Sequence, residues 1–110
     1  MPQLQFHGID AHAIQHCSTQ LVDDLCQAMD TTPDNFLLEV IQSTQILSGE
    51  VVTPFPFVDV RWFERGQSVR DQSAAVIAKH LNMAGYNPVE IIFTALEPHA
   101  YYENATHFGE

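Results

Sequence analysis

Basic side chains are scarce in this chain. It has 4 Lys and Arg residues against 14 Asp and Glu residues, which gives a formal net charge of -10 at pH 7. A charge of that sign and size repels phosphate backbones and anionic lipid headgroups. We therefore expect neither nucleic acid nor a membrane surface as a partner. The sequence also lacks an apolar run of the roughly 18 residues that a membrane span needs, and its first residues lack the pattern of a secretory signal. These absences predict a cytoplasmic protein.

Cysteine is equally sparse, with only Cys17 and Cys26. Both fall in one predicted helix, where nine positions (26 − 17 = 9) at about 1.5 Å of rise separate them by roughly 13 Å, too far for a disulfide. Their spacing fits no common zinc template, so we expect free thiols that pack as small hydrophobic groups. His12 and His16 lie one helical turn apart, but no third ligand is evident nearby. We expect no metal and no cofactor.

Hydrophobic residues are plentiful, at 45% of 110 residues. That length and composition predict one globular domain over residues 1–110. The first half is typical of strand, helix and strand: residues 3–7 alternate polar and apolar side chains, and Asp10 is a plausible N-cap for an amphipathic helix that ends near Asp30. A mostly apolar strand follows at residues 36–41.

The second half restarts this pattern after a connection at residues 42–55. A strand rich in Val, Trp and Phe is predicted at residues 57–63. Ser68, three residues before an aspartate, resembles a capping box at the start of a second helix, and Gly85 is a natural stop for that helix. Another apolar strand is predicted at residues 89–96. The element order is therefore strand, helix, strand, twice over.

Prolines mark the same repeat. Pro2 and Pro56 precede the opening strands of the two halves and lie 54 residues apart (56 − 2 = 54). Pro33 and Pro88 precede the closing strands and lie 55 residues apart (88 − 33 = 55). We interpret residues 2–43 and 56–97 as pseudo-repeats and residues 98–110 as an aromatic tail. The predicted fold is α/β (α+β), a duplicated βαβ unit with a four-stranded mixed sheet and two helices on one face. A ferredoxin-like fold has the same element order and stays an alternative, although the long central link favours two separately closed units.

A Met1-Pro2 start, the Pro-headed repeat and this element order together resemble the tautomerase superfamily over nearly the whole chain. The length and duplicated unit are similar to its macrophage migration inhibitory factor and 5-carboxymethyl-2-hydroxymuconate isomerase branches. The second half resembles the single-unit 4-oxalocrotonate tautomerase chain in three segments: Pro56-Phe57-Val58-Asp59-Val60, Glu64-Arg65-Gly66 and Val89 to Thr94; His107-Phe108-Gly109 also has a counterpart there. The resemblance implies a homotrimer with active sites at subunit interfaces, each around an amino-terminal proline that acts as general base.

The chemistry of such a proline follows from its structure. Removal of Met1 would leave Pro2 with a secondary amine whose reference pKa is near or somewhat above roughly 8. A base poised near the working pH can remove a proton alpha to a carbonyl and return it elsewhere, which is enol-keto tautomerisation of a small 2-oxo or enol substrate without a cofactor. The alternative is that Pro2 merely begins an edge strand, where a missing N–H costs nothing.

The chain departs from the family in its arginines. The oxalocrotonate enzymes bind a dicarboxylate with arginines, but here Arg65 is displaced by one position, and Glu90 stands where that family has a strand arginine. A dicarboxylate substrate is therefore disfavoured. Arg65 is our first candidate for an anion site and Arg61 the second. The alternatives are that Arg65 is a surface arginine or pairs with Glu64 or Asp71, and that Arg61 pairs with Asp59.

The tail resembles in character the aromatic tail of the migration inhibitory factor branch. Tyr101 or Tyr102 could donate a hydrogen bond to a developing enolate, and Phe108 could wall an apolar pocket. All three rings could instead be interface packing. His80 lies beside an apolar stripe, which predicts a half-buried structural histidine. A tautomerase is thus the favoured hypothesis, with a non-catalytic trimeric binding or structural protein of the same fold as the alternative.

Overall fold

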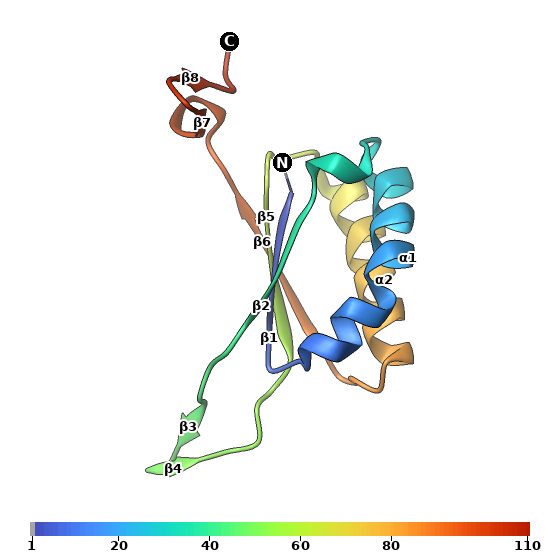
Figure 1. The fold of residues 1–110 in the computed structure, drawn as a ribbon, viewed down its shortest axis with the longest axis vertical. Helices are drawn as coiled ribbons and strands as arrows, with labels where there is room; N and C mark the ends of the chain where they lie inside the picture. The colour runs from blue at the N-terminus through green and yellow to red at the C-terminus, as the bar shows by residue number, and fades with distance from the viewer. Residues whose placement is uncertain (1) are drawn as a thin grey trace.

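One mixed sheet carries two helices on one of its faces in the computed structural model, which describes residues 2–110 (Figure 1). Its strands are β1 (Gln3–His7), β2 (Leu37–Ile41), β5 (Phe57–Trp62) and β6 (Glu90–Ala95), in the order β2-β1-β5-β6. Each half of the chain pairs its own two strands in parallel, β1 with β2 and β5 with β6, and the halves meet through the antiparallel pair β1–β5. The predicted fold class is confirmed.

The strand order also decides between the two topologies that the element order allowed. A ferredoxin-like sheet splits each βαβ unit, so that another strand lies between its two parallel strands. Here β1 is hydrogen-bonded directly to β2, and β5 directly to β6. The ferredoxin-like interpretation is therefore wrong, and the two units close separately.

The helices are α1 (Ala11–Met29) and α2 (Gln67–Met83), and neither is long and apolar enough to cross a membrane, a statement that covers residues 2–110. Asp10 caps α1 as predicted, because its carboxylate accepts a hydrogen bond from the His12 amide at 3.0 Å. The predicted Ser68 cap of α2 is wrong. The N-cap is Gly66, at φ +95°, and the Glu64 carboxylate accepts from the Gly66 amide at 2.8 Å.

The core lies between the sheet and the helices. Its fully buried apolar side chains come from alternate positions of the two central strands and from both helices: Leu4, Phe6, Val58, Val60, Trp62, Leu21, Leu25, Ile77 and Leu81. The intervening strand residues point to the other side of the sheet, called the open face below. Two of its apolar residues are substantially exposed, Leu37 at 43% and Ile92 at 48%. A single copy of the chain therefore leaves this face uncovered.

Two short hairpins were not predicted. The connection of residues 42–55 contains β3 (Ile46–Leu47) and β4 (Glu50–Val51), and the tail contains β7 (Tyr102–Glu103) and β8 (Thr106–His107). Figure 1 shows them extending from opposite ends of the sheet. Strands of two residues are too short to show an alternating pattern in the sequence, so periodicity alone misses them.

Gly8 joins β1 to α1 and allows a contact that no other residue would tolerate. Its φ is +71°, and a Cβ atom built there would lie 2.7 Å from the Phe55 carbonyl oxygen. We expect Gly8→Ala to lower the free energy of unfolding by about 2 kcal/mol or more, because backbone strain and a steric clash add. Gly49 is the matched control: its φ is +76°, but a Cβ would meet nothing within 4 Å. If urea unfolding shows that Gly8→Ala and Gly49→Ala lower the free energy of unfolding equally, the close approach of Gly8 to the Phe55 carbonyl has no effect on stability, which contradicts this prediction.

Candidate active site

Pro2 and Pro56 occupy equivalent positions in the two units. The carbonyl of Pro2 accepts a hydrogen bond from the Leu37 amide at 3.0 Å, and that of Pro56 accepts from the Glu90 amide at 3.2 Å. Since β1 and β5 are antiparallel, the two prolines head their strands at opposite ends of the sheet. The ring of Pro2 is fully buried. The edge-strand interpretation of Pro2 is wrong, because β1 lies between β2 and β5.

A cavity of about 310 Å³ lies at the Pro2 end of the sheet. Its lining residues come from β1, β5 and the segment that follows β6 into the tail: Gln3, Arg61, Leu96, Glu97, Ala100, Tyr101 and Tyr102. Gln3 and Arg61 are direct partners in the β1–β5 pair. Arg61 Nη1 donates to Gln3 Oε1 at 3.4 Å, and Gln3 Nε2 donates to the Tyr101 hydroxyl at 2.9 Å. The side-chain amide of Gln3, the residue directly after Pro2, thus links the Arg61 guanidinium to the Tyr101 phenol.

Aromatic rings support this cavity from the tail. Tyr101 packs edge to face against Phe63, with ring centroids 5.4 Å apart, and against Phe108 at 5.0 Å. The Phe108 amide also donates to the Tyr101 carbonyl at 3.0 Å. Phe108 therefore lies behind Tyr101 and fixes its ring, whereas Tyr102 lines the cavity and is 56% exposed.

The end of the tail is held by His99. Its Nδ1 lies 3.1 Å from Glu97 Oε1, and its Nε2 lies 3.0 Å from the Glu110 carbonyl oxygen. Gly109 packs so closely that a Cβ atom there would lie 2.6 Å from the His99 ring. The hydrogen bonds to Glu110 and then to Glu97 raise the pKa of His99, and the bonds from His99 lower the pKa of the Glu97 carboxyl group. The cavity therefore has an ionised carboxylate at Glu97.

Arg65, our first candidate for an anion site, lies elsewhere. Its Nη1 donates to the Phe63 carbonyl at 2.9 Å, and its guanidinium carbon lies 5.4 Å from the centroid of the Trp62 ring. Burial lowers the pKa of this guanidinium. Its suggested partner Glu64 binds Arg70 instead. Among the described residues, Arg65 therefore holds the loop before α2 and does not line the Arg61 cavity.

Neither the Glu90 nor the Asp59 carboxylate lines this cavity. Glu90 lies opposite Phe57, whereas Arg61 lies opposite Thr94, four residues along β6 and thus roughly 13 Å away. The alternative that Arg61 pairs with Asp59 is wrong. The Asp59 carboxylate accepts a hydrogen bond from the Thr94 hydroxyl at 2.9 Å instead. The remaining carboxylate at the cavity is Glu97.

His80 is a buried structural histidine, as predicted. It is 6% exposed, and its Nε2 lies 2.7 Å from Asp24 Oδ2. Cys17 and Cys26 are both free and partly buried, and burial raises the pKa of both thiols, which fits their predicted role as small hydrophobic groups. Within residues 2–110, no three His, Cys, Asp or Glu side chains are grouped to hold a metal ion.

Comparison with known proteins places the chain in a family. The family model described as a domain of unknown function, DUF1904, matches residues 1–107. The chain belongs to the DUF1904 family. A DUF1904 protein of Sebaldella termitidis ATCC 33386 has a similar structure, with 27% identity, a TM-score of 0.91, and coverage of 98% of this chain and 100% of the other. No curated protein matches the DUF1904 chain in a sequence search.

More distant structures share the fold. Native fused 4-OT has 8% identity and a TM-score of 0.78 over 96% of this chain and 94% of its own. A macrophage migration inhibitory factor homologue from Prochlorococcus marinus has 16% identity and a TM-score of 0.73 over 98% of each chain. Pt0534, described as inactivated by 2-oxo-3-pentynoate, has 12% identity and a TM-score of 0.75 over 97% of this chain and 94% of its own. The DUF1904 chain therefore has the tautomerase-superfamily fold that its sequence resembles.

Proposed function

We propose that this DUF1904 protein is a cytoplasmic, cofactor-independent enol-keto tautomerase whose general base is the amine of Pro2 after removal of Met1. The observation that carries the proposal is the hydrogen-bonded set Arg61, Gln3 and Tyr101, which lines a cavity one residue from Pro2. Proton transfer next to a carbonyl by an amine base is assisted by a cation that binds the substrate carboxylate and by a phenol that donates to the enolate oxygen.

Each group has a distinct part in the reaction. The lone pair of the Pro2 nitrogen removes a proton alpha to the carbonyl. The C–H electron pair forms the new C=C bond, and the π pair of the carbonyl moves onto oxygen, which gives an enolate. The Tyr101 hydroxyl donates a hydrogen bond to that oxygen. The protonated amine then returns the proton to a different atom of the substrate. Arg61 binds a carboxylate of the substrate, and Gln3 orients both Arg61 and Tyr101.

The charges at the cavity favour a substrate with a single carboxylate. Arg61 is the cation that lines it, and the ionised Glu97 lines it too. A second carboxylate on the substrate would find no second cation among the lining residues, and it would lie near the Glu97 carboxylate, with which His99 is already paired. We therefore propose a small 2-oxo monoacid or its enol, with Tyr102 providing aromatic surface around its other end and Phe108 supporting the Tyr101 ring from behind.

A homotrimer with active sites at subunit interfaces is part of the same proposal. The open face presents Leu37 and Ile92 to solvent, and the β3–β4 hairpin presents Ile46 and Val51 at 67% and 73% exposure. Apolar surface of this kind on a sheet and an extended hairpin is typical of an interface between subunits. A neighbouring copy over the open face would close the shallow Arg61 cavity.

The proposal is tested by labelling with 2-oxo-3-pentynoate, an electrophilic alkynyl ketone that inactivates the structural relative Pt0534. Tag-free protein is first shown by intact mass to have lost Met1 and is then incubated with the reagent. We expect a single adduct, which peptide mapping locates on Pro2, because an unprotonated secondary amine adds to the activated alkyne. The matched control is the same protein with an N-terminal extension, in which the Pro2 nitrogen is an amide and should not react.

An adduct absent from Met1-free protein, or found only on Cys17 and Cys26, would contradict the proposal. That result would favour the alternative of a non-catalytic trimeric binding or structural protein with the same fold. The observation in favour of this alternative is the full burial of the Pro2 ring.

A further inference from the structure

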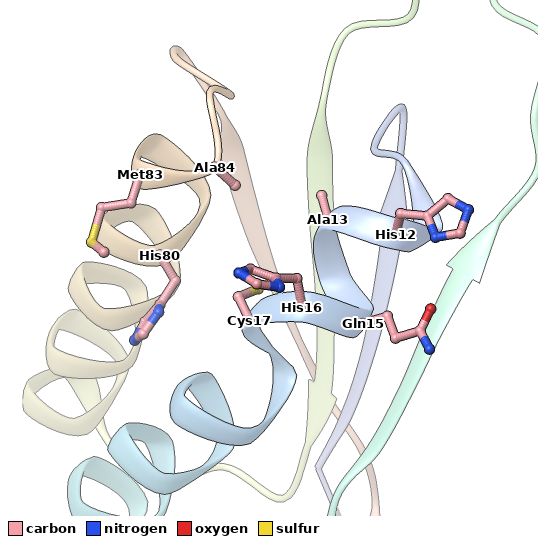
Figure 2. Close-up of a pocket in the computed structure, with 8 residues that line it drawn as sticks. All are labelled: His12, Ala13, Gln15, His16, Cys17, His80, Met83 and Ala84. Carbon is pink, nitrogen blue, oxygen red and sulfur yellow. The ribbon is translucent and has the colours of Figure 1, made fainter.

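A second cavity, of about 920 Å³, lies in the helical layer, away from the open face of the sheet (Figure 2). It is bounded by the first two turns of α1 and the last turn of α2. The side chains used below are His16 and Cys17 from α1 and His80 and Met83 from α2. In Figure 2 the rings of His16 and His80 lie on the two sides of the gap between the helices. Since the helices cover only one face of the sheet, subunits that pack on the open face leave this cavity accessible.

The protonation of His80 follows from its partner. Its Nε2 lies 2.7 Å from the Asp24 carboxylate, which is ionised and can only accept a hydrogen bond, so Nε2 carries the proton. The hydrogen bond from His80 is the main cause that lowers the pKa of Asp24, which keeps this arrangement in place at neutral pH. In the neutral ring, Nδ1 is then an acceptor. Asp24 thus orients a buried imidazole that lines the cavity, and the neutral form of that ring has Nδ1 as its acceptor.

The other walls determine what kind of molecule fits. No Lys, Arg, Asp or Glu residue lines the cavity, although the chain has a net charge of -10. Apolar surface comes from Cys17 and Met83 and from two alanines, one in α1 and one directly after α2. Exposed polar side chains of α1 line the rest: His12, Gln15 and His16. A cavity of this size that combines apolar surface with a few polar groups has the general character of a small-molecule site. Of its polar side chains, His80 is the buried one, and a second residue holds its orientation.

We propose that the cavity between α1 and α2 binds an uncharged small molecule with an apolar body and one hydroxyl or N–H group, which donates a hydrogen bond to Nδ1 of His80. His80 selects the ligand through its acceptor nitrogen, and Asp24 acts as a positioning residue that holds the tautomer. This site is separate from Pro2 and does not depend on tautomerase activity.

Phenol and toluene are the probes, because they have nearly the same shape and differ in the hydrogen-bond donor. Each is titrated into the full chain by calorimetry, and the imidazole nitrogens of His80 are followed by 15N NMR. We expect saturable binding with phenol at least 10-fold tighter than toluene, and a shift of the His80 Nδ1 signal with phenol alone. His80→Leu and Asp24→Asn should each reduce the preference for phenol to less than about 3-fold. His99→Gln, far away in the tail, should leave it unchanged.

Equal affinities for the two probes, or a phenol preference that persists in folded His80→Leu protein, would overturn the proposal. If His80→Leu does not fold, Asp24→Asn and the wild-type NMR signal decide the matter. A phenol titration that leaves the wild-type His80 Nδ1 signal unchanged would also overturn the proposal.

Discussion

Pro2→Ala is expected to lower kcat/KM for ketonisation of phenylenolpyruvate by about 100-fold or more, which is the usual contribution of a general base. The substitution replaces a ring-held secondary amine by a flexible primary amine. Pro2 heads the central strand β1 and contributes a carbonyl to the Leu37 amide, and alanine preserves that carbonyl. The loss should therefore reflect chemistry rather than folding.

Pro56→Ala is the matched control for this substitution. Pro56 heads β5 as Pro2 heads β1, and its carbonyl accepts from the Glu90 amide in the same way. Its nitrogen is an internal amide and has no basic lone pair. Rates measured on tag-free proteins of confirmed mass should fall for Pro2→Ala and change less than about 3-fold for Pro56→Ala. Turnover that is indifferent to both changes would exclude Pro2 as the base.

Arg61→Leu is expected to raise KM for a monocarboxylate substrate by about 10- to 100-fold, because a hydrogen bond to a charged group contributes about 1.5–3 kcal/mol. Leucine retains an apolar side chain on β5 but removes the guanidinium, which also frees Gln3 Oε1 of its 3.4 Å contact. The effect should be on KM more than on kcat, since the carboxylate is bound equally in the ground state and the transition state.

Arg65→Leu separates this role from a general loss of positive charge. Arg65 packs on Trp62 and donates to the Phe63 carbonyl, so its removal should lower the melting temperature while leaving KM within about 3-fold. A KM that rises for Arg65→Leu and stays constant for Arg61→Leu would reverse our assignment of the carboxylate-binding arginine.

The sequence was sufficient for elements whose pattern is local. Alternation placed β1, three- and four-residue spacing placed α1, and Asp10 marked the start of that helix correctly. The start of α2 was misplaced because a serine with an acidic residue three positions later looks like a cap. The backbone of Gly66, with φ +95° and its amide bound by Glu64, begins the helix instead.

The candidate site was only partly predictable, because it depends on pairing between the two halves. Arg61, Tyr101 and Tyr102 were selected by residue type, and the fold brings them to one cavity. Gln3 was missed. Its amide links Arg61 to Tyr101 only because β1 and β5 run antiparallel in a register that sets Gln3 opposite Arg61. No local pattern in the sequence encodes that register.

The antiparallel pairing of the two units through β1 and β5 determines how many active sites each chain can provide. Joining them in one chain places equivalent prolines at the two ends of the sheet, and the proposed removal of Met1 would turn only Pro2 into an amine. Pro2 and Pro56 are thus equivalent in backbone position but not in chemistry. Under the proposed function, each polypeptide has one basic nitrogen at this position, so a trimer has three reactive centres. Six half-length chains arranged in the same shape would have six.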